Sequence, residues 1–547
     1  SVIIGMARGF SIISVLAAVL CGVPFITTCA NAIAVTTQAQ LNNAVATSAV
    51  IDLSNSFSLT TGVTKASSNT GISISAVTGM TIYGHGYAID ATTNRRIMYV
   101  GELSNIVIED ITLMNGYVSS YHGAAIYILT STVTLNSVTF TNNYCNSCNG
   151  GAIYVFTTST LIATSVIFNG NSAVGTGYGG AVWAQSSTTI TMTSSTLTSN
   201  AAAYAGGAIY TGSSCTFTLT SCTLTGNSVA AGSAGGVYVG SSSTVVLQDT
   251  VVSTNTASTL AGGMQIESSS NVQALRCTFS SNVASNGVAG GLWLGSYAVT
   301  TLADSVVSDN TASSNGAGLW INTYATTTIS SSLLSNNFGA SGGAIFSSSQ
   351  CTLTLSGTTI YSNTAKSGGG GLYLAAPNTM VMSTSNVTGN VVSVSGHGGG
   401  MHVAGSWSLI AITSTYIDNN KAFTTGYGGG IYSASANNLM VLKGCSFFDN
   451  TAAASKGNDV YSTTLGNNVV VKSLCSDGTY NAGAGVLDCP LCIESFNADL
   501  MSGSCSSCAG GTSGCMGALM CLSSPAFACS TAASTQAEVT FLVATDA

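Results

Sequence analysis

A six-residue phrase that returns about every 28 residues constrains the fold of this chain more than any other feature. The phrase holds two small residues, an Ala or Gly, an aliphatic residue, an aromatic residue and an aliphatic or small residue, and residues 150–155 (GGAIYV) are a clear copy. The intervals between copies run from 26 to 30 residues, and Gln265 and His402 fill the aromatic position in two of them. The aromatic residues at this position are Tyr127, Tyr154, Trp183, Tyr210, Tyr238, Trp293, Trp320, Phe346, Tyr373, Tyr432 and Tyr461. Self-similarity at a fixed period predicts a repeat architecture.

A second column keeps the same period. It reads as an apolar residue, two polar residues and then Asn, as in residues 140–143 and 447–450. Its Asn residues are Asn143, Asn171, Asn200, Asn227, Asn255, Asn282, Asn310, Asn337, Asn363, Asn390, Asn420 and Asn450. Because buried amides must be paired, we expect this column to turn inward at a corner, with each amide bonded to the amide one repeat away.

Each repeat between about residues 115 and 470 contains three short runs in which apolar residues alternate, for example 153–155, 160–164 and 165–168. Three strands per repeat imply a parallel β-helix, an all-β solenoid in which equivalent strands pair at about 4.8 Å from coil to coil. The aliphatic residue before each aromatic then faces the interior, and the aromatic faces outward. The glycine pairs are expected at tight corners with positive φ. The repeat therefore favours one elongated domain over several globular ones.

The pairing of GGAI or GGAV with FxxN, as at 150–153 with 140–143, resembles the polymorphic outer-membrane-protein repeats of bacterial autotransporter adhesins. More broadly, the chain resembles the right-handed parallel β-helix, or pectin-lyase-like, fold over roughly residues 35–470. This resemblance implies a right-handed, single-stranded β-helix with three strands per coil of about 28 residues. Some relatives with this fold cleave polysaccharides, so the resemblance alone leaves the function open.

The composition restricts the class of protein and its partners. Only 5% of the residues are charged, which is typical of a secreted or cell-surface protein whose exterior is solvated by Ser, Thr and Asn. The net charge of −8 and the ten scattered basic residues exclude a nucleic acid as partner, because binding to phosphates requires clustered Lys and Arg. Beyond residue 32 no apolar run approaches the ~18 residues that a membrane-spanning helix needs, so the mature chain is expected to lack one.

The ends of the chain differ from the repeats. Residues 1–32 resemble a signal peptide, with Arg8 before an apolar run at 10–26 and an A-x-A cleavage pattern at 30–32. Residues 33–114 are expected to form an N-terminal cap and the first coils, beginning with a short helix at 38–46. The repeats occupy 115–470, a cysteine-rich module follows at 471–530, and 531–547 is expected to be a truncated tail.

The spacing C-x13-C-x2-C-x12-C-x2-C in the cysteine-rich module resembles the ephrin-receptor-like modules of eukaryotic surface proteins. An even set of cysteines in a secreted chain predicts a disulfide framework, although the two C-x2-C pairs also have the spacing of a zinc site. These cysteines are Cys475, Cys489, Cys492, Cys505, Cys508, Cys515, Cys521 and Cys529.

Cysteines within the repeats are expected to behave differently. Cys145 and Cys148 are close enough to form a local bridge. Cys215 and Cys222 are too far apart along an extended strand to bond to each other. The remaining three, Cys277, Cys351 and Cys445, have no cysteine in the same column one coil away and are predicted to be buried free thiols.

The repeats do not show the clustered acids of a catalytic site. Sugar-cleaving enzymes of this fold need clustered acids with Arg or Lys, but the acids of the repeats are spread at roughly one per coil. The one constellation worth testing brings His85, Arg95 and Arg96 near Glu109 or Asp110. The glycine-rich stretches lack the Lys-Ser/Thr of a phosphate loop and the Asp of a calcium-binding nonapeptide, so no cofactor and no metal are expected.

We therefore expect a secreted or cell-surface structural or adhesive protein without enzymatic activity. One alternative is a carbohydrate-binding protein that uses an exposed aromatic ladder, although the rings can equally stack on one another as structure. A second is a polysaccharide lyase or glycoside hydrolase. Threonine runs such as 216–220 also suggest a surface that binds ice. The outward-facing positions, however, are not expected to align regularly from one coil to the next. Asn386 begins an N-V-T sequon and is the expected glycosylation site. The expected partners are extracellular glycans or surface proteins. Self-assembly of the protein is also compatible with the sequence.

Overall fold

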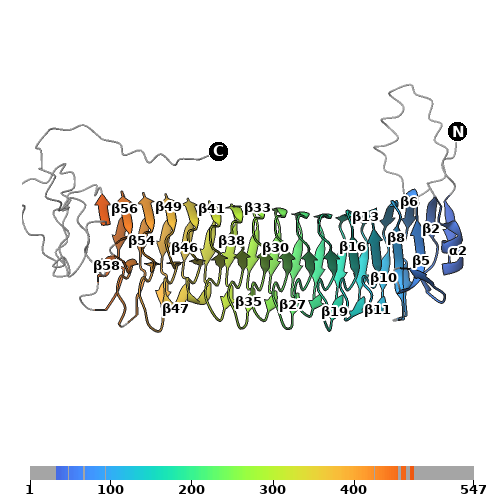
Figure 1. Cartoon of the computed structure of the whole chain (residues 1–547), viewed down its shortest axis with the longest axis horizontal. Coiled ribbons are helices and arrows are strands. Elements are labelled where there is room, and N and C mark those ends of the chain that lie inside the picture. The colour runs from blue at the N-terminus through green and yellow to red at the C-terminus, as the bar shows by residue number, and fades with distance from the viewer. Residues whose placement is uncertain are drawn as a thin grey trace, which may run out of the picture.

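The computed structural model describes residues 32–472, apart from 47–48, 66–67, 93, 424, 436, 454–456 and 463–468. The expected signal peptide at 1–32 lies outside the described residues except for its last residue, and the cysteine-rich module and tail lie outside them except for 471–472. The described chain is a straight rod of stacked coils (Figure 1). The coils follow one another along the rod in the order of the sequence (Figure 1). It is an all-β parallel solenoid with one short helix, as the repeats predict.

One short helix caps the first coil. Helix α2 (Gln38–Ala44) begins at Thr37, whose hydroxyl accepts the backbone N–H of Gln40 in a capping box. The buried Gln38 amide anchors the helix, since it donates to the carbonyls of Thr61 and Gly71 at 2.6 and 2.7 Å. Its oxygen accepts the backbone N–H groups of Thr60 and Thr61. The predicted helix at 38–46 is therefore confirmed, and it covers the first rung at one end of the rod (Figure 1).

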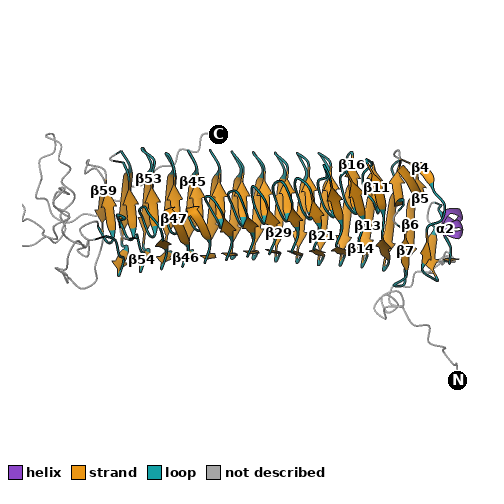
Figure 2. Cartoon of the chain, turned by 90° about the horizontal axis from the view of Figure 1, so that it is seen from below, coloured by secondary structure: helices purple, strands orange, loops and turns teal. Residues whose placement is uncertain are grey.

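Three long sheets extend along most of the rod, and a fourth, shorter sheet covers its central coils. A representative coil contains β12 (Ile126–Leu129), β13 (Thr132–Asn136), β14 (Thr139–Thr141) and β15 (Tyr144–Asn146). Sheet A contains β13 and has 17 strands, and sheet B contains β14 and has 15 strands. Sheet C contains β12 and has 16 strands, and sheet D contains β15 and has 11 strands. The strands of successive coils lie side by side in straight rows (Figure 2). Apart from β4 (Val63–Lys65), which pairs antiparallel with β5 (Ser68–Ser75) in sheet C, each sheet contains one strand from each coil that reaches it.

The expectation of three strands per coil holds for coils that do not reach sheet D, whereas the coils that reach sheet D have four. The missed strand follows directly after the Asn column, as in β19 (Ser172–Val174) and β23 (Ala201–Ala202). Strands of two or three residues are too short to show an alternating pattern in the sequence. Sheet D starts at β11 (Tyr117–Ser119) and ends at β51 (Val391–Val392).

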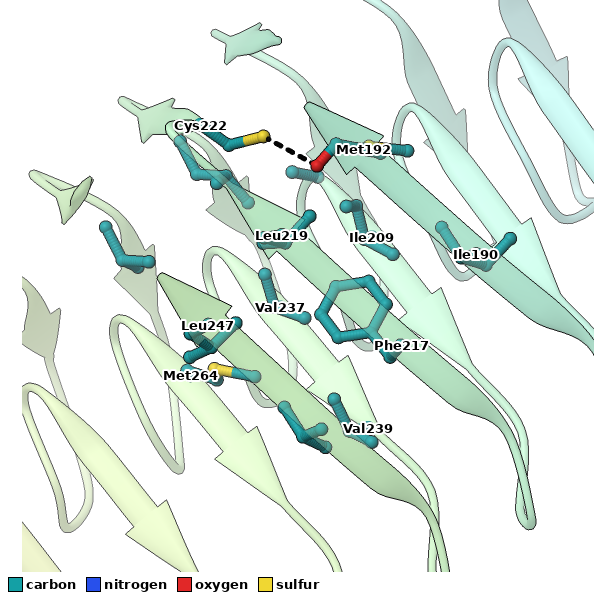
Figure 3. Close-up of a cluster of buried hydrophobic side chains, with 14 of the residues drawn as sticks. Ile190, Met192, Ile209, Phe217, Leu219, Cys222, Val237, Val239, Leu247 and Met264 are labelled. Atoms are coloured by element: carbon teal, nitrogen blue, oxygen red, sulfur yellow. Dashed lines mark hydrogen bonds between the residues drawn. The ribbon is translucent and has the colours of Figure 1, made fainter. Parts of the chain in front are cut away.

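The register places like residues over like. In sheet C, Tyr127 pairs with Tyr154, Tyr154 with Trp183, and Trp183 with Tyr210. The aliphatic residues before them are fully buried, so the interior is a continuous apolar core. Ile190, Phe217 and Leu247 from sheet A meet Ile209 and Val237 from sheet C within that core (Figure 3).

Paired glycines turn the chain into sheet C. Gly150 has φ +70°, a conformation that residues with a Cβ rarely adopt. Gly151 lies so close to the next coil that a Cβ would stand 2.0 Å from the carbonyl oxygen of Gly180. The first glycine is therefore needed for the turn, and the second for the close approach of two coils.

The cysteines of the repeats behave as their spacing predicts. Cys145 and Cys148 form a disulfide within their loop. The other five repeat cysteines, Cys215, Cys222, Cys277, Cys351 and Cys445, are buried free thiols. Within the described part of the chain, no helix has the length and apolar character needed to cross a membrane.

Candidate functional site

The Asn column forms a hydrogen-bonded ladder at the corner between sheets B and D. Asn227 is representative: its backbone N–H and its Nδ2 both donate to Oδ1 of Asn255, each at 2.9 Å. Its Nδ2 also donates to the carbonyl of Leu197 at 2.9 Å. The same pattern runs from Asn143 to Asn450, and all of these side chains are buried. The last amide, Asn450, donates to the buried Asp459 carboxylate at 2.8 Å, which closes the ladder.

Two further columns of small polar residues, which the repeat phrases did not predict, occupy the corners on either side of sheet A. Between sheets C and A, the backbone N–H of Ser104 donates to Oγ of Ser131, and that of Ser131 to Oγ of Ser159. Between sheets A and B, the N–H of Cys277 donates to Oγ of Ser305 at 2.9 Å. The buried thiols stand at Ser or Thr positions of these columns, so they belong to the corners and not to a reactive site. The sequence signal for these corner columns is a position at which Ser, Thr, Cys or Asn recurs from one coil to the next.

The aromatic ladder on sheet C is more buried than the alternation predicted. The rings do point away from the core, but each packs on its neighbour, with Tyr154 at 4.4 Å from Trp183 and Tyr210 at 4.6 Å from Tyr238 between ring centroids. Tyr127, Tyr154, Trp293, Phe346 and Tyr432 are buried. The other rings, those of Trp183, Tyr210, Tyr238, Trp320, Tyr373 and Tyr461, are half-buried.

Loop side chains add to this cover. His122 stacks on Tyr154 at 4.3 Å, and Tyr178 packs edge-on against Tyr210 at 5.1 Å. Burial raises the pKa of the Tyr154 and Tyr238 hydroxyls above the usual value for tyrosine. The ring faces are therefore occupied by other rings, which leaves mainly edges toward solvent.

Two polar residues interrupt this ladder. Gln265 is buried and donates from Nε2 to Glu267 at 2.6 Å. His402 is buried between Tyr373 and Tyr432, with ring centroids at 4.6 and 4.8 Å. Burial, and then the neighbouring His397, lower the pKa of His402 to about 3, so the ring is neutral at ordinary pH. His402 is therefore a ladder residue.

The expected constellation around Glu109 and Asp110 is not assembled. Arg96 lies at the start of β8 (Arg96–Gly101) in sheet C, where its side chain is fully buried. It donates to the carbonyl oxygens of His122 and Gly123 at 2.8 and 3.1 Å, and its guanidinium carbon lies 5.0 Å from the Tyr127 ring centre. Burial lowers the pKa of Arg96 to about 10.

The other members of that constellation lie elsewhere. Glu109 ends β9 (Asn105–Glu109) in sheet A and accepts a hydrogen bond from Asn136 at 2.8 Å. His85 contacts Asp52 at 3.1 Å, and Arg95 donates to the adjacent Asn94. Sequence proximity was misleading here, because Arg96 and Glu109 belong to different sheets of one coil.

Other titratable groups are spread along the rod. The guanidinium of Arg276 binds both carboxylate oxygens of Asp249 at 2.6 and 2.9 Å on the surface, and this contact lowers the pKa of Asp249. Among the described residues no three His, Cys, Asp or Glu side chains gather in a way that could hold a metal ion. Asn386, the predicted glycosylation site, is exposed in β50 (Asn386–Thr388) on sheet B.

A pair of exposed aromatic residues lies away from the predicted ladder. Tyr297 and Tyr324 are 57% and 44% exposed and stack on each other at 4.9 Å. Both have positive φ, at +60° and +62°, at the corner between sheets C and A. They occupy a column that holds Ser in earlier coils, so nothing in the repeat phrase pointed to them.

Comparison with known proteins identifies the family. The family model described as "Right handed beta helix region" matches residues 62–250, 179–334, 236–408 and 298–474, in four overlapping segments. No curated protein matches the chain. The matched segments together cover most of the chain and the rod of stacked coils described above. The chain therefore belongs to the right-handed β-helix family.

Proposed function

We propose that this protein is a secreted or cell-surface rod with a structural or adhesive role and no enzymatic activity. The observation that carries the proposal is the continuous stacking of sheet A, whose 17 strands at about 4.8 Å each give a stiff body of about 75 Å. Each coil is held to the next by backbone bonds, and polar side chains at three corners add hydrogen bonds between many of the coils. Such a body can hold two attachment points a fixed distance apart.

The polar surface supports an extracellular role. No Asp, Glu, Lys or Arg occurs between residues 111 and 248, so this part of the rod is solvated by neutral side chains alone. The signal-like sequence at 1–32 supports secretion, and the likeness of the GGAI and FxxN repeats to those of polymorphic outer-membrane proteins supports adhesion. A cysteine-rich module at 471–530, similar to ephrin-receptor-like modules, would give the rod a disulfide-stabilised end.

A carbohydrate-binding role on the aromatic ladder has less support. Sugar rings bind to the open face of an aromatic side chain, but in this ladder the faces of Tyr154, Trp183 and Tyr210 lie against one another. A polysaccharide-cleaving role has less support again, since the described acids are spread along the rod and Arg96 is buried away from them.

The proposal is tested by two assays on the full secreted chain. In the first, beads coated with the protein are applied to immobilised extracellular glycans and to cell surfaces, with heat-denatured protein as the control. In the second, the protein is incubated with pectins and other polysaccharides, and unsaturated uronides and new reducing ends are measured. We expect adhesion without product. Product formation that is lost in the Glu109→Gln or Arg96→Gln variant would show instead that the protein is an enzyme.

A further inference from the structure

One face of sheet A carries an aligned array of threonines. It consists of the outward residues of five successive strands: β13, β17 (Thr160–Thr164), β21 (Thr189–Thr193), β25 (Thr216–Thr220) and β29 (Thr244–Gln248). We call this surface the threonine array. Its first column is Thr132, Thr160, Thr189, Thr216 and Thr244, all in register. Eleven of its fifteen positions are Thr, and Ile162 and Val246 make thirteen β-branched.

This alignment corrects the expectation of uneven outward positions. Coil lengths differ by up to two residues here, since consecutive first-column residues are 28, 29, 27 and 28 positions apart. The turns absorb the difference, and the five-residue strands stay in register without a shift. The face is therefore regular although the sequence intervals are not.

The threonines of the array have restricted side-chain rotamers and no side-chain hydrogen-bond partner among the residues that the structure describes. Within the described part of the chain, none of the eleven hydroxyls takes part in a hydrogen bond. Their side chains range from half-buried to exposed. A β-branched side chain keeps few χ1 rotamers, so little side-chain entropy is lost when the surface is covered. Each of the eleven threonines offers a methyl group and a hydroxyl in a small number of orientations.

The spacing of the array approaches that of crystalline water. Neighbouring strands lie about 4.7–4.9 Å apart, and alternate residues along a strand about 6.6–6.8 Å apart. In a tetrahedral network with O–O bonds of about 2.75 Å, second-neighbour oxygens are about 4.5 Å apart, and the layers repeat at about 7.3 Å. The strand spacing and the spacing of alternate residues each differ from the corresponding water spacing by about a tenth or less. A regular, rigid face of this kind fits an extended lattice better than a single small molecule.

The chemistry of the face separates ice from other extended partners. The fifteen positions hold no aromatic residue, and polysaccharide surfaces are usually bound by aromatic rings that stack on sugars. They also hold no charge, which argues against a charged mineral or a membrane headgroup. We propose that the threonine array binds the surface of ice. This activity goes beyond the structural role proposed above and does not depend on it.

The test compares the full-length protein with two charge-matched variants. The double variant Thr191→Lys, Thr218→Lys places two ammonium groups in the middle column of the array. The matched control is Ala411→Lys with Val381→Lys, in the same column of sheet A but outside the array. Circular dichroism and thermal unfolding establish that all three proteins are folded. Fluorescently labelled protein is then partitioned between a slowly growing ice hemisphere and the liquid, and the suppression of ice recrystallisation is measured.

We expect the wild type and the control to be enriched in ice. The enrichment of the array variant in ice should be at least tenfold lower. Exclusion of the folded wild type from ice would overturn the proposal, as would equal enrichment of the array variant. Retention of the wild type on crystalline cellulose or chitin, abolished by the array variant and without enrichment in ice, would assign the face to a polysaccharide instead. Adhesion in the bead assay would be unaffected by any of these results, so the two proposals fail separately.

Discussion

At the scale of single residues, buried polar side chains at the corners hold one coil on the next. An amide within the Asn ladder, such as that of Asn255, accepts two hydrogen bonds from the preceding coil and donates to two further oxygens. A hydrophobic core alone would tolerate coils that slip by two residues, because the alternation would be preserved. The amide has a partner only in the native register, so the ladder specifies which coil positions align.

Replacing Asn255 by Ala tests this role. The change leaves two donors of Asn227 and the carbonyl of Leu224 without their partner, and each buried unpaired group costs about 1–3 kcal/mol. We expect the unfolding free energy to fall by about 2–5 kcal/mol, with faster amide exchange in the two adjacent coils. Asn271→Ala is the matched control, because Asn271 is exposed on sheet A. Equal effects of the two substitutions on denaturant unfolding would contradict a role of the ladder in stability.

His402 makes the stability of its coil depend on pH. The folded-state pKa of about 3 lies below the usual value near 6.5, so the unfolded chain binds the proton more readily. The contribution of the neutral ring is complete above pH 6.5 and is lost as the pH falls below it. His397 and the tyrosines Tyr373 and Tyr432 surround the ring.

We expect the wild type to lose about 2 kcal/mol more than His402→Phe between pH 7.5 and pH 5. Phe keeps an aromatic ring in the ladder without the titrating group, so the difference between the two proteins isolates His402 from the other histidines. Urea unfolding at the two pH values measures it. An identical pH dependence in both proteins would contradict the lowered pKa, because it would show that His402 has the same pKa in the folded and unfolded states.

At the scale of elements, α2 protects the first coil from solvent and from pairing with other strands. An open solenoid end exposes unpaired backbone groups, which a cap must cover. The cap depends on Gln38, whose single side chain bonds to three residues of the first coils, Thr60, Thr61 and Gly71. The helix is therefore attached by hydrogen bonds as well as by the burial of Leu41.

Gln38→Ala is expected to detach the helix while leaving the central coils folded. Removal of four hydrogen bonds near the end of a solenoid acts mainly on the nearest coils, because each coil contacts only its neighbours. Hydrogen exchange should rise at least tenfold in residues 33–75 and stay unchanged near residue 250. Asn43→Ala, on the exposed side of the same helix, is the control and should change neither region.

At the scale of the whole molecule, the coil is the unit of length. Asn227 and Asn255 are equivalent positions one coil apart, so removing residues 228–255 joins Asn227 to Thr256, the register partner of Ser228. We expect this deletion to give a folded rod that is shorter by one coil, about 4.8 Å. Removal of residues 228–241, half a coil, should abolish cooperative unfolding instead. Circular dichroism and small-angle scattering distinguish the two results.

Much of this architecture could be predicted from the sequence. The aromatic and Asn residues recur once per coil, because equivalent positions of successive coils stack on one another. The capping helix and the buried thiols followed from spacing in the same way. The fourth strand did not, since two-residue strands carry no alternation. The burial of rings such as Tyr154 depends on loop residues such as His122, which lie outside the repeat phrase. The alignment of Thr191 over Thr218 depends on turns that absorb unequal coil lengths, and intervals along the sequence do not show this.

Distances between equivalent positions of sheet A test the stacked register most directly. Spin labels are attached to genetically encoded azido residues, which leaves the native cysteines unlabelled, at the pairs 191 with 301, 191 with 354 and 191 with 411. These positions are four, six and eight coils apart in the register of sheet A. Pulsed electron paramagnetic resonance should give backbone separations of about 19, 29 and 38 Å, a constant rise of about 4.8 Å per coil. Distances that do not increase in proportion to the number of coils would contradict the stacked register.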